Sequence, residues 1–113
     1  SLLGELLACA REWGMEPLVE VHDDREMERA IDASALVVGV NNRDLRTFRT
    51  DIGVSLDLAS LIPPECVSVS ESGIRSRAQI VQLEAAGYHA FLVGEALSGA
   101  GNPEEVLKAL TGE

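Results

Sequence analysis

Long hydrophobic runs are absent from this sequence of 113 residues. Its longest apolar stretches, such as ALVVGV and AFLVG, are far shorter than the ~20 residues that a membrane-spanning helix needs. The first residues also lack the basic flank of a signal peptide. The remaining composition, 46% hydrophobic and 25% charged, is typical of a globular domain. We therefore expect a soluble chain with no membrane partner.

Basic residues and cysteines are also scarce. Nine Lys and Arg stand against 19 Asp and Glu, which gives a net charge of −10. Because binding to a phosphate backbone relies on clustered Lys and Arg, we expect no nucleic-acid partner. A small anion would have to be held by backbone N–H groups and helix N-termini. Cys9 and Cys66 lack the spacing of a metal site and are typical of small hydrophobes in a reducing cytoplasm, so we expect a cytoplasmic protein without metal or cofactor.

Strand-like and helix-like segments alternate along the chain. Four short apolar runs have strand character: LVEVH (18–22), ALVVGVN (35–41), CVSVSES (66–72) and AFLVGEA (90–96). Segments of helical period follow each run, namely REMERAIDA, IGVSLDLASLI, AQIVQLEAAG and PEEVLKAL, and LLGELLACAREWG precedes them all. Strands that are apolar throughout are typical of a parallel sheet covered by helices. The predicted class is α/β, with the order αβαβαβαβα.

Signals for helix ends agree with this order. Asp23 and Glu26 have the spacing of a capping box, which predicts the start of the second helix. Gly14 and Gly87 stand where helices should end, and Pro103 falls in the first turn of the last helix.

Polar residues and glycines follow every predicted strand. They are Glu20, His22, Asn41, Asn42, Arg43, Glu71, Ser72, Gly73, Gly94 and Glu95. A barrel collects its site from many strand ends, whereas a doubly wound sheet uses one switch point, and no G-x-G-x-x-G follows the first strand. This pattern favours barrel geometry. We expect His22 to be a polar residue of the rim, and Asn42 and Asp44 to serve the turn of Asn-Asn-Arg-Asp.

The number of strands is too small for a closed barrel. A (β/α)₈ barrel takes ~250 residues and eight strands, and four parallel strands cannot close. Each end strand would then expose an unpaired edge. We expect residues 1–113 to form a single (β/α)₄ half-barrel with a leading helix at 1–13. Its partner would be a missing N-terminal half or a second copy, paired through the exposed strand edges.

Four motifs resemble the C-terminal half of the indole-3-glycerol phosphate synthase family. They are PLVEVH, GVNNRDLRTF, VSESGI and FLVGEAL, in this order, and the likeness runs from about residue 18 to residue 110. The resemblance implies strands five to eight of a TIM (β/α)₈ barrel. It also implies a carbon–carbon lyase of tryptophan biosynthesis. That enzyme closes the indole ring of 1-(2-carboxyphenylamino)-1-deoxyribulose 5-phosphate, an anionic sugar phosphate, with decarboxylation and dehydration.

The resemblance further implies roles for individual residues. Glu20 matches the family's general base, Asn41 a residue that hydrogen-bonds the substrate, and Glu71 a carboxylate of the network around the catalytic lysine. Arg43 and Ser72 match substrate-binding positions. Simpler interpretations remain open: Glu20 as a solvated strand-end carboxylate, Asn41 as a turn residue and Arg43 as a surface residue.

Two turns at adjacent strand ends predict a phosphate site. Ser72 and Gly73 follow the third strand, and Gly94 and Glu95 follow the fourth. Glycines leave the backbone open to a phosphate, and N–H groups at the entry to a helix can bind it. In barrels the loops after the last two strands often hold phosphate.

Lysine is nearly absent. Lys108, the single lysine, lies in the closing helix, which we expect outside the barrel and far from the rim. By resemblance, the catalytic lysines belong to the missing half, and arginine stays protonated and is a poor proton donor. We therefore expect this chain alone to be inactive. The alternative hypothesis is a non-catalytic half-barrel that self-associates and binds phosphate.

Overall fold

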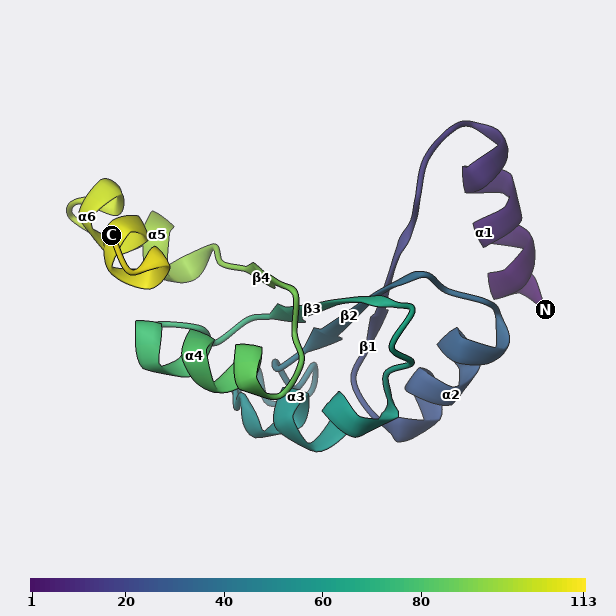
Figure 1. Cartoon of the computed structure of the whole chain (residues 1–113), viewed down its shortest axis with the longest axis horizontal. Coiled ribbons are helices and arrows are strands. Elements are labelled where there is room, and N and C mark those ends of the chain that lie inside the picture. Colours follow the sequence, from purple (N-terminus) through teal and green to yellow (C-terminus); the bar gives the residue numbers. More distant parts are fainter.

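A four-stranded parallel sheet forms the centre of the computed structural model, which describes residues 1–113 (Figure 1). Its strands are β1 (Leu18–Val21), β2 (Val37–Asn41), β3 (Val67–Glu71) and β4 (Ala90–Leu92). They lie side by side in the order β1-β2-β3-β4, and every neighbouring pair is parallel. The predicted parallel α/β fold is confirmed.

Six α-helices and one 3₁₀ turn accompany the sheet. They are α1 (Leu2–Glu12), α2 (Asp24–Asp32), α3 (Gly53–Leu58), η1 (Ala59–Leu61), α4 (Arg77–Ala85), α5 (Glu95–Ser98) and α6 (Pro103–Thr111). Figure 1 shows α2, α3 and α4 along the same side of the sheet. None of the helices has the length and apolar content that a membrane crossing requires. The prediction missed α5, because Glu95 was expected in a loop.

The predicted helix ends are present. The side chain of Asp23 accepts a hydrogen bond from the N–H of Glu26 at 2.8 Å and caps α2, but the predicted capping box is incomplete, because the Glu26 side chain accepts from the N–H of His22 instead. Gly14 and Gly87 have φ values of 77° and 112°, the left-handed region in which glycine ends a helix. Pro103 is the first residue of α6, where its missing N–H costs no hydrogen bond.

One face of the sheet is covered by helices and forms the core. Successive side chains in a strand point to opposite faces. Val21, Val38 and Val40 are fully buried on the covered face. They belong to a cluster that also contains buried side chains from α2, α3 and α4, namely Met27, Ala30, Leu58, Ile80 and Leu83.

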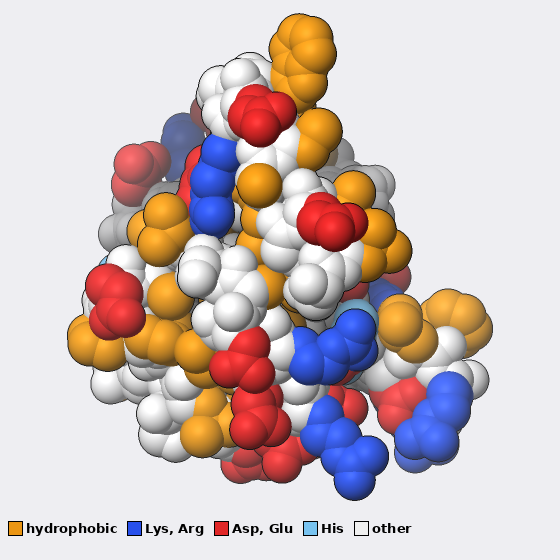
Figure 2. All heavy atoms as spheres, turned by 90° about the vertical axis from the view of Figure 1, so that its right-hand side faces the viewer, with side chains coloured by type: hydrophobic (Ala, Val, Ile, Leu, Met, Phe, Trp, Pro, Cys, Tyr) orange, Lys and Arg blue, Asp and Glu red, His pale blue; other side chains and the backbone are white.

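The opposite face, here called the open face, carries the alternate residues of each strand. Strand register aligns them in three rows: Leu18, Val37 and Val67; Glu20, Gly39, Val69 and Ala90; and Asn41, Glu71 and Leu92. Leu18, Val67 and Leu92 are 45%, 46% and 59% exposed. Figure 2, which views the side with α1 and α2, shows further hydrophobic surface between acidic and basic side chains. Hydrophobic side chains are therefore exposed on the surface as well as packed in the core.

Candidate active site

The carboxyl ends of the strands bring together the residues that the sequence singles out. Glu20 and Glu71 lie on the open face at β1 and β3, and Asn41 ends β2 between them. Arg43 follows in the next loop, where its N–H donates to Oδ1 of Asn41 at 3.0 Å. Ser72 comes directly after β3. Strand order and register thus place these side chains along one rim.

Glu71 forms an acid pair with Glu20. The Glu71 side chain leans over Gly39, where a β-carbon would overlap its carboxyl group. Glu71 is 5% exposed, and its Oε2 has no hydrogen-bond partner unless the pair holds a proton. Burial raises the pKa of Glu71 to about 7, helped by the hydrogen bond and the negative charge of Glu20, while His22 opposes the shift. Near neutral pH the pair therefore exchanges a proton readily.

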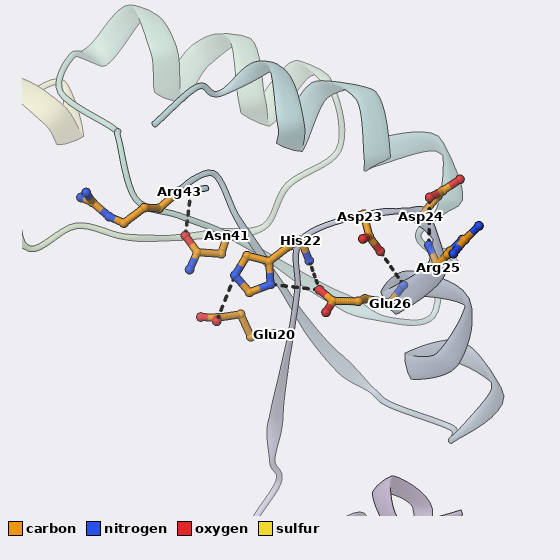
Figure 3. Close-up of polar contacts among 8 residues, drawn as sticks. All are labelled: Glu20, His22, Asp23, Asp24, Arg25, Glu26, Asn41 and Arg43. Atoms are coloured by element: carbon orange, nitrogen blue, oxygen red, sulfur yellow. Dashed lines mark hydrogen bonds and ion pairs between the residues drawn. The ribbon is translucent and has the colours of Figure 1, made fainter. Parts of the chain in front are cut away.

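His22 lies between two carboxylates rather than simply at the rim. Its Nδ1 is 3.0 Å from Oε1 of Glu26, and its Nε2 is 3.6 Å from Oε2 of Glu20 (Figure 3). Its backbone N–H also donates to Oε1 of Glu26, at 2.7 Å. Sequence reasoning missed this contact, although the spacing of His22 and Glu26 across the start of a helix is a signal for it.

Asn42 is a buried structural residue, and its prediction as a turn residue is wrong. It is 1% exposed, and its Nδ2 donates to Oγ of Ser70 at 3.0 Å and to the carbonyl of Ser72 at 3.1 Å. Its Oδ1 accepts from the backbone N–H and the hydroxyl of Ser55, at 3.1 and 2.7 Å. The amide thus connects the loop after β2 to β3 and α3, and it holds Ser72 in place.

Asp44 does serve the turn as predicted. Its Oδ1 accepts hydrogen bonds from the backbone N–H groups of Arg46 and Thr47, at 2.7 and 3.2 Å. These two bonds lower the pKa of Asp44, because they stabilise the carboxylate. The turn shapes the loop that carries Arg43.

The four predicted phosphate residues line one cavity of about 230 Å³. Its lining comprises Arg43, Ser72, Gly73, Ile74, Arg75, Leu92, Val93, Gly94, Glu95 and Ala96. Ser72 and Gly73 have φ values of 72° and 74°, so the backbone turns sharply there. A β-carbon on Gly73 would come within 2.7 Å of the Thr50 side chain. The turn therefore requires glycine at this position.

Two arginines at this cavity share one carboxylate of the chain. Oε1 of Glu95 lies 2.9 Å from Nη2 of Arg43, and its Oε2 lies 3.8 Å from Nη2 of Arg75. A carboxylate thus sits where an incoming anion would meet the guanidinium groups. The Glu95 side chain is thus a counter-ion of the two arginines, and the prediction that the turn at Glu95 binds phosphate stays a prediction.

A larger groove of about 800 Å³ lies between the loops that follow β1 and β2. His22, Asn41 and Arg43 are among its lining residues, and Arg43 also lines the smaller cavity. No group of three or more His, Cys, Asp or Glu side chains is arranged to hold a metal ion. The rim therefore contains two adjoining spaces that share the Arg43 side chain, beside the Glu20–Glu71 carboxyl pair.

Comparisons with known proteins agree with each other. A family model described as indole-3-glycerol phosphate synthase matches residues 1–110. The protein of that name from Dehalococcoides mccartyi strain BAV1 is 52% identical over 98 residues, which cover 87% of this chain and 38% of the relative. The one from Syntrophobacter fumaroxidans is 50% identical over 112 residues, which cover 99% and 42%.

The fold also occurs in a solved structure of low sequence identity. The crystal structure of the Amycolatopsis orientalis BexX/CysO complex matches with a TM-score of 0.71 and 23% identity, over 96% of this chain and 45% of the other. At this identity the likeness concerns the fold alone. In each of these comparisons the chain spans less than half of the protein it matches.

Proposed function

This chain belongs to the indole-3-glycerol phosphate synthase family, and from this premise we propose that it forms strands five to eight of a TIM (β/α)₈ barrel with that activity. Curated relatives are more than twice as long as the matched segment, which leaves room for four further strands. The open face, with Leu18, Val67 and Leu92 about half exposed, would become the barrel interior.

The substrate we propose is 1-(2-carboxyphenylamino)-1-deoxyribulose 5-phosphate, which has a phosphate at one end and an aromatic carboxylate at the other. The observation that carries this proposal is the position of Arg43, which lines both the small cavity and the larger groove. The small cavity would take the phosphate through the backbone N–H groups near Ser72, Gly73 and Gly94. The ribulose carbon atoms would then lie over the open face, near Glu20 and Glu71.

Glu20 would be the base of the reaction, and Glu71 would shape the charge around it. Ring closure needs an acid near the carbonyl oxygen, and the dehydration that follows needs a base. The pKa of Glu71, raised to about 7, lets that carboxyl group hold a proton near neutral pH beside Glu20. Asn41 would orient the substrate through an amide that both donates and accepts. The acid and the cation for the aromatic carboxylate would be lysines of the rest of the protein.

Activity measurements of the chain alone and of the assembled barrel test this proposal. The chain would be assayed alone and mixed with the N-terminal part of the Syntrophobacter fumaroxidans relative. We expect indole-3-glycerol phosphate only from the mixture, and a large loss with Glu20→Gln. Glu28→Gln, an exposed carboxylate of α2, is the matched control. Turnover by the chain alone would show that its own residues suffice.

A second candidate is a non-catalytic half-barrel that self-associates and binds phosphate. The half-exposed apolar residues of the open face and the unpaired edges of β1 and β4 favour it. Light scattering of the purified chain distinguishes a monomer from a dimer. A monodisperse dimer supports self-association, and a monomer at high concentration contradicts it.

A further inference from the structure

Two carboxylates, of Glu20 and Glu26, contact His22, and its charge acts on a third, Glu71. Glu20 comes from β1, Glu26 from the first turn of α2, and Glu71 from β3. The side chain of Asp23 caps α2, so the first turn of the helix points Glu26 back toward the end of β1 (Figure 3). Oε1 of Glu26 is then the common acceptor for the backbone N–H of His22, at 2.7 Å, and for Nδ1, at 3.0 Å.

The contact with Glu26 fixes the proton on the His22 ring. An ionised carboxylate accepts hydrogen bonds and donates none, so Nδ1 must carry the hydrogen. In the neutral ring Nε2 is then an acceptor. Yet Nε2 is buried without a hydrogen-bond partner, and it lies 3.6 Å from Oε2 of Glu20, which is another acceptor. The arrangement is favourable only when a proton lies between Nε2 and Glu20.

We propose that Glu26 and His22 are positioning residues for Glu20: Glu26 fixes the His22 ring through Nδ1, and when the ring is protonated its Nε2–H holds the Glu20 carboxylate toward Glu71. The importance of this for catalysis rests on the proposed function, in which Glu20 is the base. The contacts among Glu26, His22 and Glu20 do not depend on that function, because all three residues belong to this chain. His22 would act through Glu20 and would not touch the substrate.

The electrostatic surroundings of His22 are mixed. The walls of the groove that it lines carry both signs of charge: Asp23, Glu26, Asp44, Asp51, Arg43, Arg46 and Arg49. Glu20 and Glu71 face the ring from the open face. The charge of His22 lowers the pKa of both Asp44 and Glu71. The charge on the ring therefore affects the pKa of a member of the acid pair.

The second histidine of the chain supplies an internal reference. Nδ1 of His89 accepts a hydrogen bond from the backbone N–H of Ser68 at 3.0 Å, so the hydrogen of its neutral ring must be on Nε2. The structure therefore assigns opposite tautomers to the only two histidines, His22 and His89.

NMR of the ¹⁵N-labelled chain tests whether Glu26 fixes the tautomer of His22. Ring nitrogens would be correlated with the carbon-bound ring protons at a pH at which both rings are neutral. We expect N–H at Nδ1 for His22 and at Nε2 for His89. Glu26→Ala should remove the preference of His22 and leave His89 unchanged, and Glu28→Ala on the same helix should change neither. An Nε2–H tautomer for His22 in the unmutated chain overturns the proposal without recourse to a variant.

The titration of Glu71 tests whether His22 acts on the acid pair. A purely structural role of His22 would leave the pKa of Glu71 unchanged. The pKa of about 7 would be followed through the carboxyl carbon of Glu71. His22→Gln removes the charge that lowers it, so the midpoint should rise, whereas His89→Gln should leave it in place. An unchanged midpoint in His22→Gln overturns the proposal.

Activity provides the link to catalysis. In the mixture with the N-terminal part of a relative, His22→Gln should lower kcat and leave KM nearly unchanged, because substrate contacts are retained. An unaltered kcat would contradict the positioning role. Neither NMR measurement needs substrate. A mixture without lyase activity would therefore refute the proposed function, while the tautomer and the titration would still decide this inference.

Discussion

The two faces of the sheet use the same four strands in opposite ways. On the covered face Val21, Val38 and Val40 are fully buried against helices, whereas Leu18 and Leu92 on the open face remain about half exposed. Burial of a whole aliphatic side chain contributes about 1.5–3 kcal/mol to stability, so most of the free energy of folding comes from the covered face. In the proposed barrel the open face would be left for the substrate and for the other strands.

Polar groups show the same contrast. Ser68 and Ser70, on the covered face, are buried with every hydroxyl in a hydrogen bond, to Gly87, Asn42 or Ser55. The two buried side-chain atoms without a partner are Nε2 of His22 and Oε2 of Glu71, both at the candidate active site. An unsatisfied buried group costs about 1–3 kcal/mol. The chain tolerates that cost only where proton transfer is proposed.

The largest difference between the faces should appear when one leucine is shortened on each. Leu83→Ala opens a cavity between α4 and the covered face and should cost about 2–5 kcal/mol in the free energy of unfolding. Leu92→Ala, on the open face, should stay within about 0.5 kcal/mol. Chemical denaturation measures both. Equal losses would mean that the open face is covered in solution, as it would be in a dimer.

Stability should fall as the pH rises toward neutrality. The pKa of Glu71 is raised from 4.5 to about 7 in the folded state, so the folded chain binds a proton that the unfolded chain has lost. This stabilisation is complete below pH 4.5 and disappears as the pH passes 7, a change on the order of 3 kcal/mol. Denaturation from pH 4 to 8 measures it.

Glu71→Gln should remove this pH dependence, because glutamine is neutral throughout. Glu28→Gln should retain it, since that side chain is exposed on α2. A slope that persists in Glu71→Gln would assign the proton to another group.

Adjacent asparagines allow a smaller comparison. Asn42→Ala should cost about 1–3 kcal/mol, because Ser55 and Ser70 each lose one hydrogen-bond partner in a buried network and keep only each other's hydroxyl. Asn41→Ala removes one contact, to the backbone N–H of Arg43, and should cost less than about 1 kcal/mol. Thermal unfolding would rank the two variants. The reverse order would contradict the structural role of Asn42.

The smallest expected effect concerns phosphate. The isolated chain should bind phosphate with a dissociation constant on the order of millimolar, because lysines are lacking at the rim. Glu95→Gln frees Arg43 and Arg75 and should tighten binding only a few-fold, since exposed ion pairs contribute ~1 kcal/mol or less. The amide NMR shifts of Ser72, Gly73 and Gly94, followed while phosphate is added, measure the binding.

Glu104→Gln is the control for this measurement, because Glu104 pairs with Lys108 within α6, away from the cavity. Shifts confined to residues elsewhere would refute the phosphate site. Weaker binding by Glu95→Gln would show that Glu95 assists the anion rather than competing with it.

The sequence predicted the elements well, because hydrophobic period and caps are local signals. All four strands and the helices of nine or more residues were found within a few residues of their bounds. α5 has four residues, which is too short to show a period. Asn42 was misread because local rules place asparagine in turns, whereas its partners Ser55 and Ser70 become neighbours only after folding.

The common place of the candidate residues at one rim was predictable, but their contacts were not, and their roles stay predictions. Strand ends identify Glu20, Asn41 and Glu71, since parallel strands gather their carboxyl ends at one edge. Which carboxyl group of the pair titrates near neutrality depends on burial, which no local pattern encodes. Gly39 in the middle of an apolar strand was a usable signal, because such a glycine often marks the close approach of another group, here the Glu71 carboxyl.

The spatial order of the strands, identical to their order in the chain, has a consequence for the route of folding. No pairing in the sheet skips a strand, so each new contact requires only the closure of one helical connection. The entropy lost in closing such loops grows slowly with their length, and local topologies fold fast. The sheet can therefore grow one strand at a time as the chain emerges from the ribosome. In the proposed barrel β1 would pair with the strand that precedes it in the chain, and the one long-range closure would join β4 to the first strand after all the others are in place.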